Sequence, residues 1–297
     1  MALRVLISAG EASGDLYAAR LAVALKTRFP GAEFFGCAGP RMRQAGVEPT
    51  VDAARLAVVG LVEVVLHIPR IYGEYRRLCR AIEAKRPDAA ILTDSPDFHL
   101  RIARFIKRLP GPPIPVVYLV APQAWAWRKG RLPKMRRVID RLLCIFPFEE
   151  DFFRRHGIAA TYIGHPLSRL VRASTTRPEF FARHGLPLGQ PLIALLPGSR
   201  QGEAARHLPA VLDAVERIQS AIPASFILAL PLGSNARQRL SASFSERIRR
   251  SSIKVIEGET WDILAHSDLA LAASGTVTIE AALLGTPMVT FYKVMAL

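Results

Sequence analysis

The chain has 297 residues, half of them hydrophobic, and its 40 Lys and Arg outnumber 25 Asp and Glu to give a formal net charge of +15. This length suits two domains of ordinary size, the start lacks the features of a signal peptide, and no apolar run approaches the roughly 18 residues of a membrane-spanning helix. The three cysteines lie far apart in apolar surroundings without metal-site spacing, which argues against disulfide-rich and zinc-binding classes and favours buried thiols in a cytosolic protein.

The first half of the chain alternates short β-rich runs with helical patterns. Strands are predicted at residues 4–9, 33–37, 89–93, 115–120, 141–145 and 161–163. Helices are predicted between them, at residues 16–28, 71–86, 100–108 and 149–156. This alternation is typical of a parallel, doubly wound sheet in an α/β fold.

The alternation pauses near residues 165–177 and then restarts. Strands are predicted at residues 192–196, 225–230, 253–256, 269–272 and 288–291, with helices at 203–220, 235–250, 260–266 and 276–284. We therefore predict two Rossmann-like domains, residues 1–168 and 169–297, whose parallel sheets face a cleft. The chain stops just after the last predicted strand, so the second domain is expected to be incomplete at its C-terminus.

The first polar loop, SAGEASGD at residues 8–15, follows the first strand and opens a helix. Glycines at such a turn let backbone N–H groups approach a phosphate, and a helix N-terminus favours the negative charge. The candidates for holding hydroxyl groups or an acceptor phosphate are Gly10, Glu11, Ser13 and Gly14. Helix capping by Ser13 or Asp15 is the plainer alternative.

An unusually apolar run follows at residues 58–71, and cations border it. An apolar surface rimmed by Lys and Arg is typical of docking at a membrane interface, although such runs are as often plain core. The candidates for this membrane patch are Leu61, Val62, Val64, Val65, Leu66 and Ile68.

The motif TDSPDFH at residues 93–99 places two carboxylates and an imidazole at the end of a strand. Glycosyl transfer with inversion needs one general base on the acceptor hydroxyl. Asp97 is the candidate for that base, and Asp94 and His99 are candidates for orienting it. Turn formation by Asp-Ser-Pro-Asp is the alternative.

The segment PQAWAWRKGR at residues 122–131 combines two tryptophans with a basic run. These residues could stack nucleic-acid bases and bind phosphates, or lie at a lipid interface, or simply pack beside a solvated basic helix. The high positive charge favours anionic partners in general, without choosing between them.

Two further strand-to-helix turns in the second half are candidates for binding a diphosphate and its nucleoside. LPGSRQGE at 196–203 offers Ser199 and Arg200, whose guanidinium adds a fixed cation. SGTVTIE at 274–280 offers Ser274, Gly275 and Thr276, and Glu280 lies one helical turn further on, where a carboxylate could accept ribose hydroxyls. Apolar neighbours of Glu280 predict that its helix is largely buried.

In this order, the motifs SAGEASGD, DSPDFH, PQAWAWRKGR, GHPL, LPGSRQGE and SGTVTIEAALLGTPMV resemble the lipid A disaccharide synthase family over the whole chain. The resemblance implies a GT-B-type fold and an inverting glycosyltransferase of lipid A biosynthesis. The donor would be UDP-2,3-diacylglucosamine and the acceptor 2,3-diacylglucosamine 1-phosphate, giving a β-1,6-linked disaccharide and UDP. It also implies work as a peripheral protein on the cytoplasmic side of the inner membrane of a Gram-negative bacterium, with no metal and no cofactor.

By the same resemblance, Asp97 matches the family's essential aspartate, and residues 199–200, 274–276 and 280 match its UDP-binding motifs. His99 stands where the family has asparagine, a mild departure. The family continues beyond the last residue of this chain through helices that take part in a homodimer, so dimer formation and activity depend on that segment. The alternatives are another UDP-sugar transferase or epimerase, a basic RNA-binding protein, and an inactive truncated form.

Overall fold

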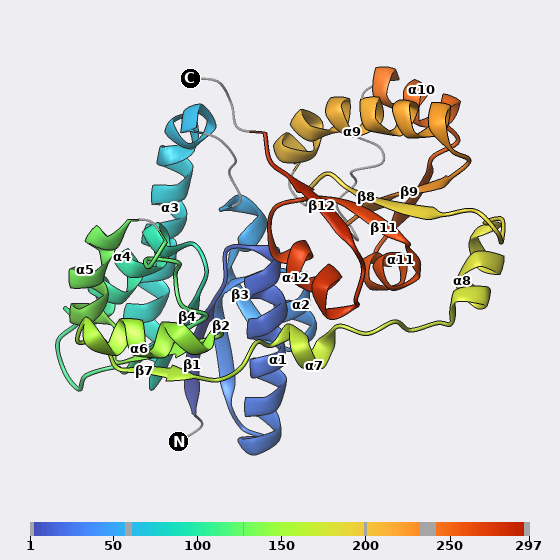
Figure 1. Cartoon of the computed structure of the whole chain (residues 1–297). Coiled ribbons are helices and arrows are strands. Elements are labelled where there is room, and N and C mark those ends of the chain that lie inside the picture. The colour runs from blue at the N-terminus through green and yellow to red at the C-terminus, as the bar shows by residue number, and fades with distance from the viewer. Residues whose placement is uncertain (1–2, 57–60, 127, 199–200, 232–241, 294–297) are drawn as a thin grey trace. The chain divides into compact units, whose positions relative to one another are not determined.

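The computed structural model describes residues 3–56, 61–126, 128–198, 201–231 and 242–293 (Figure 1). It divides the chain into two compact units, Met1–Pro166 and Leu167–Leu297. Each unit is a parallel sheet with helices on both faces, which confirms the predicted α/β class. No helix of the described part of the chain is long and apolar enough to cross a membrane.

The first unit has a seven-stranded sheet in the order β3-β2-β1-β4-β5-β6-β7. Its strands are β1 (Arg4–Ser8), β2 (Glu33–Ala38), β3 (Val47–Asp52), β4 (Ala89–Thr93), β5 (Val116–Leu119), β6 (Arg141–Cys144) and β7 (Ala160–Tyr162). Its helices are α1 (Ala12–Arg28), α2 (Pro40–Gln44), α3 (Leu61–Lys85), α4 (Pro96–Ile106), α5 (Leu132–Val138) and α6 (Pro147–Arg155). The strand order reverses between β1 and β4, and ligands of doubly wound sheets bind beside such a reversal.

One face of this sheet packs against α3, α4 and α5, and α1 and α2 lie on the other (Figure 1). Leu6, Leu92 and Leu142 are fully buried in the cluster under α3–α5. Each such leucine stabilises the fold by about 1.5–3 kcal/mol relative to an exposed one. The three cysteines, Cys37, Cys79 and Cys144, are buried free thiols, as predicted.

The second unit has a five-stranded sheet in the order β10-β9-β8-β11-β12. Its strands are β8 (Leu192–Leu196), β9 (Ser225–Leu230), β10 (Lys254–Glu257), β11 (Leu269–Ala273) and β12 (Met288–Phe291). Its helices are α7 (Leu167–Leu170), α8 (Arg177–His184), α9 (Gln201–Ala221), α10 (Ala242–Arg250), α11 (Thr260–His266) and α12 (Thr276–Leu283). Here the order reverses between β8 and β11.

Alternate residues of β8 supply the two sides of this second core. Leu192, Ala194 and Leu196 pack with α8, α11 and α12, whereas Ile193 and Leu195 pack with α9 and α10. A strand buried on both faces is apolar at every position, which is why the run at 192–196 is continuous.

The structure corrects several predicted elements. Strand β3 and helices α2, α5, α7 and α8 were not predicted, and α3 begins at Leu61 rather than at residue 71. The apolar run at residues 61–70 is therefore the start of a long helix and not a connection between elements. Strand β3 was missed because it is an edge strand with Pro49 and three polar residues among its six.

Candidate functional site

Asp97 lies in the first turn of α4, just after β4 ends at the strand-order reversal of the first unit. A negative charge is favourable at this end of a helix. The Asp97 side chain is 71% exposed, and its Oδ2 accepts hydrogen bonds from Arg128 Nη1 at 2.9 Å and Arg131 Nη2 at 2.7 Å. Asp97 thus presents an exposed carboxylate at the carboxyl edge of the sheet, held at one oxygen by two cations.

The carboxylate of Asp94 accepts hydrogen bonds from the backbone of the first loop. Oδ1 accepts the backbone N–H of Gly10 at 2.8 Å, and Oδ2 accepts that of Glu11 at 3.1 Å. A Cβ built on Gly14 would lie 1.7 Å from Oδ2 of Asp94, so this glycine permits the close approach of the two loops. Burial raises the pKa of Asp94 to about 8, with the charge of Glu11 adding to the rise and the N–H donor of Gly10 opposing it.

These contacts change the role predicted for the first loop. The N–H groups of Gly10 and Glu11 already donate to Asp94, so neither is open to a phosphate in this conformation. Glu11 precedes the first residue of α1, Ser13 is half-buried in its first turn, and neither side chain caps that helix. Asp15 caps α2 instead, by accepting N–H groups of Gly39, Arg41 and Met42.

His99 is fully buried and orients the backbone of Asp94 rather than the side chain of Asp97. Its Nδ1 lies 3.0 Å from the carbonyl oxygen of Asp94, which can only accept, so Nδ1 carries the proton. Its Nε2 therefore accepts from the hydroxyl of Ser8, at 2.8 Å. Burial lowers the pKa of His99 to about 4, so the ring is neutral at physiological pH.

The sequence analysis missed Tyr118 of β5. This residue is fully buried, and its hydroxyl donates to the same carbonyl oxygen of Asp94 at 2.5 Å. The sequence signal for this residue was a tyrosine inside an apolar strand. Such a tyrosine indicates a buried hydrogen bond, because a buried phenol needs a partner.

The second unit places Ser274, Gly275 and Thr276 at the exposed turn between β11 and α12, beside the reversal of strand order. The N–H of Ser274 donates to the carbonyl of Phe291, which ties this turn to the end of β12. Glu280 is half-buried in α12. The prediction that α12 is largely buried is wrong, because Ala281 is the one buried residue among its eight.

The other phosphate candidates of this unit, Ser199 and Arg200, lie outside the described residues. The loop leading to them contains Gly198, with φ +124°, and a Cβ there would meet the carboxylate of Glu203. His207 of α9 is buried and bridges this loop to the chain after β12. Its Nδ1 donates to the carbonyl of Pro197 at 2.7 Å, and its Nε2 accepts the N–H of Lys293 at 3.0 Å.

The predicted membrane patch falls largely on side chains that the structure does not describe, those of residues 61–67. Ile68 of the patch is described and is 53% exposed on α3, and Tyr72, one turn further on, is 56% exposed. At the described end of the apolar run, Ile68 therefore faces solvent, whereas Ile71 packs partly buried against the core.

The aromatic part of the Trp/Arg segment is packed. Trp125 is partly buried against the core, its ring meets that of Phe148 edge to face, and its indole N–H donates to Glu149 at 2.9 Å. Trp125 is therefore engaged in packing and hydrogen bonding within the first unit. Trp127 lies outside the described residues.

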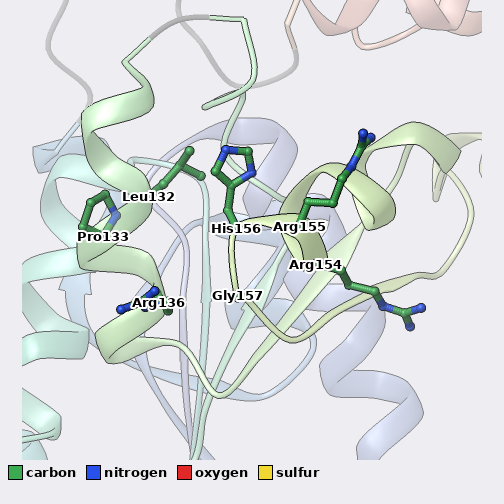
Figure 2. A pocket seen from close by; sticks show the side chains of 7 residues that line it. All are labelled: Leu132, Pro133, Arg136, Arg154, Arg155, His156 and Gly157. Atoms are coloured by element: carbon green, nitrogen blue, oxygen red, sulfur yellow. The ribbon is translucent and has the colours of Figure 1, made fainter.

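A depression of about 560 Å³ lies between α5 and the end of α6 (Figure 2). It is lined by Leu132, Pro133, Arg136, Arg154, Arg155, His156 and Gly157. The side chains of Arg154 and Arg155 project from α6 away from α5, so the cations do not converge on one point (Figure 2). None of the predicted site residues lines this depression.

Comparisons with known proteins give one family. A family model described as lipid-A-disaccharide synthetase matches residues 5–297. The lipid-A-disaccharide synthase of Solibacter usitatus (strain Ellin6076) is 63% identical over 291 residues, which are 98% of this chain and 74% of that protein. That of Koribacter versatilis (strain Ellin345) is 44% identical over 99% of this chain and 76% of that protein.

The solved structures that match this chain are similar to it in fold alone. The UDP-GlcNAc 2-epimerase of Neisseria meningitidis, bound to UDP-GlcNAc, superposes with a TM-score of 0.67 at 13% identity, over 97% of this chain and 82% of that one. A UDP complex of S. aureus MnaA superposes with a TM-score of 0.66 at 11% identity, over 96% of this chain and 78% of that one.

Proposed function

The chain belongs to the lipid-A-disaccharide synthase family, and from that premise we propose that Asp97 is the general base of its glycosyl transfer. Membership makes the chain a glycosyltransferase of lipid A biosynthesis with a UDP-sugar donor, as the sequence predicted. The epimerase and RNA-binding alternatives are not favoured, because the sequence relatives carry the synthase name and the epimerases share only the fold.

The observation that carries this proposal is the environment of Asp97. Its Oδ2 is bound by Arg128 and Arg131, while no donor from the described part of the chain bonds Oδ1. Oδ1 is thus available to take the proton of the acceptor's 6-hydroxyl. That oxygen then attacks the anomeric carbon of the donor from the side opposite the diphosphate. The new C–O bond forms as the bond to UDP breaks, which inverts the configuration.

The second unit would hold the donor. In this proposal Ser199, Arg200 and the turn at Ser274–Thr276 bind the diphosphate, and Glu280 accepts the ribose hydroxyls. Support comes from the position of both turns beside the reversal between β8 and β11, where nucleotides bind in such sheets. The scheme uses no cofactor, because base, acceptor and donor account for every bond that changes.

The acceptor would be 2,3-diacylglucosamine 1-phosphate and the donor UDP-2,3-diacylglucosamine. Their acyl chains call for a lipid surface, and the exposed Ile68 and Tyr72 on α3 support docking there. The UDP group of the donor implies the cytoplasmic side of the inner membrane as the place of the reaction. A homodimer stays a prediction from the family resemblance.

The test is UDP release by the Asp97→Asn variant with both lipid substrates. We expect a loss of about 10²–10⁴-fold in kcat, the usual contribution of a general base. Asp151→Asn removes an exposed carboxylate from α6 of the same unit and serves as the matched control. Turnover by Asp97→Asn equal to that of the control would refute the assignment.

A further inference from the structure

Arg128 and Arg131, which hold the carboxylate of Asp97, belong to one short turn, residues 128–131 (the arginine turn). Asp97 follows β4, whereas the arginine turn follows β5, the neighbour of β4 in the sheet. Both arginines also take part in further interactions within the chain. The position of the carboxylate therefore depends on where the whole turn lies, and not on either arginine alone.

The loop that leads to the arginine turn is attached to the start of α6 through Trp125. The indole N–H of Trp125 donates to Oε1 of Glu149 at 2.9 Å, and its ring meets that of Phe148 edge to face, with 4.9 Å between the ring centroids. Ala124, the preceding residue, is fully buried in the core cluster of the first unit. Trp125 lies three residues before Arg128, so these contacts hold the loop close to the point where the arginine turn begins.

Glu149 is a fixed acceptor for the indole of Trp125. It is 1% exposed, and its other oxygen, Oε2, accepts the backbone N–H groups of Ile145 and Phe146 at 3.2 and 3.1 Å. A buried carboxylate needs such donors, because it has given up its contacts with water. Ile145 and Phe146 come directly after β6, the strand next to β5, so Glu149 joins the ends of two neighbouring strands.

The arginine turn is anchored on its other side as well. Leu132 and Met135 of α5, which follow it, are buried in the same core cluster. Between the two anchors, Arg128 has a left-handed conformation, with φ +60°, before the 3₁₀ turn at Lys129–Arg131. A non-glycine residue keeps such a conformation only where the surrounding structure holds it. The contacts of Trp125 and Leu132 are placed to do this.

We propose that Trp125 and Glu149 are positioning residues for the base Asp97 and act on it through the arginine turn. The inference rests on the proposed role of Asp97 and adds the residues that fix its position. The contacts run across the carboxyl ends of three neighbouring strands, from Glu149 after β6, through Trp125 and the arginine turn after β5, to Asp97 after β4. A base that is displaced by less than an ångström slows the chemical step while the substrates still bind.

The experiment measures kcat and KM for UDP release, with each variant assayed below its own unfolding temperature. Trp125→Phe keeps an aromatic ring beside Phe148 and removes the indole N–H, so kcat should fall about tenfold while both KM values stay within twofold. Glu149→Gln breaks the same contact from the other side, and adding Trp125→Phe to it should lower kcat no further. Trp261→Phe, a half-buried tryptophan of α11 in the second unit, is the matched control and should keep the wild-type kcat.

Combination with Asp97→Asn separates positioning of the base from general support of the fold. Without the base the arginine turn has no group to place, so Trp125→Phe should leave the residual kcat of Asp97→Asn unchanged. A further tenfold loss in the double variant, or a Trp125→Phe chain with the kcat of the Trp261→Phe control, would overturn the inference while the role of Asp97 stands. Full turnover by Asp97→Asn alone would instead refute the base, and the positioning residues with it.

Discussion

The hydroxyl of Tyr118 and the imidazole of His99 converge on one atom, the carbonyl oxygen of Asp94. This peptide lies where the chain is left-handed, with φ +50° at Asp94 and +38° at Ser95. Each such non-glycine residue costs about 1–2 kcal/mol, which the buried contacts offset. Because α4 begins at the next residue, the contacts also fix the position of Asp97.

Tyr118→Phe removes one of the two donors without creating a cavity. We expect a loss of about 1 kcal/mol in the free energy of unfolding. We also expect kcat to fall about tenfold, because a slightly misplaced general base slows the chemical step without weakening substrate binding. The KM values for both substrates should stay within twofold. Hydrogen exchange should quicken at the amides of Gly10 and Glu11, which depend on Asp94. Tyr162→Phe, an exposed tyrosine of β7, is the control; a kcat equal to that of the control would contradict the prediction.

His99 makes stability depend on pH. Its pKa is about 4 in the folded chain, against the ordinary value of 6.5 in the unfolded one, so the unfolded state binds more protons between these pH values. The contribution of His99 to stability is therefore complete above pH 6.5 and falls as the pH drops toward 4, by up to about 1.4 kcal/mol per pH unit. Urea unfolding at pH 7 and pH 5 checks this.

His99→Asn is the comparison that isolates this effect, since Asn can still donate to the Asp94 carbonyl. Asp94 itself has the opposite dependence, because its raised pKa of about 8 makes stability fall as the pH rises from about 4 toward 8. This contribution is present in both chains and largely cancels. Identical losses in wild type and His99→Asn between pH 7 and pH 5 would show that the histidine is not the cause.

The sequence was sufficient to predict the strand-to-helix loops, because each is a local pattern of apolar run, glycine or proline, and helix. It did not predict which loops meet. The bond from Gly10 to Asp94 joins residues 84 apart, and that from Tyr118 to Asp94 joins residues 24 apart. Such pairs follow from the order of strands in the sheet, which no local pattern encodes. The prediction that α12 is largely buried failed for the same reason, since apolar neighbours do not determine which face a helix buries.

Gly14→Ala tests the close approach of the first loop to Asp94. The new methyl group would lie 1.7 Å from Oδ2 of Asp94, so the two loops must separate. We expect a loss of about 1–3 kcal/mol in the free energy of unfolding, as for other overpacked sites, and a large loss of activity. Gly73→Ala in α3 meets no atom within 4 Å and should instead stabilise the helix by about 0.5–1 kcal/mol. Thermal unfolding of both variants should therefore shift in opposite directions, and a Gly14→Ala shift like that of Gly73→Ala would refute the argument.

His207→Leu tests whether the loop after β8 depends on the chain after β12. The change leaves the carbonyl of Pro197 and the N–H of Lys293 without their shared partner. If this loop binds the diphosphate, as proposed, UDP affinity should fall about tenfold, because the loop loses its contact at the Pro197 carbonyl. His266→Leu is the matched control, since His266 is also buried in the second unit and also bonds a carbonyl, that of Thr175. His266→Leu should lower the free energy of unfolding about as much as His207→Leu does, by about 1–3 kcal/mol, without changing UDP affinity. Equal UDP affinities in the two variants, measured by calorimetry below both unfolding temperatures, would mean that His207 supports the fold and not the loop.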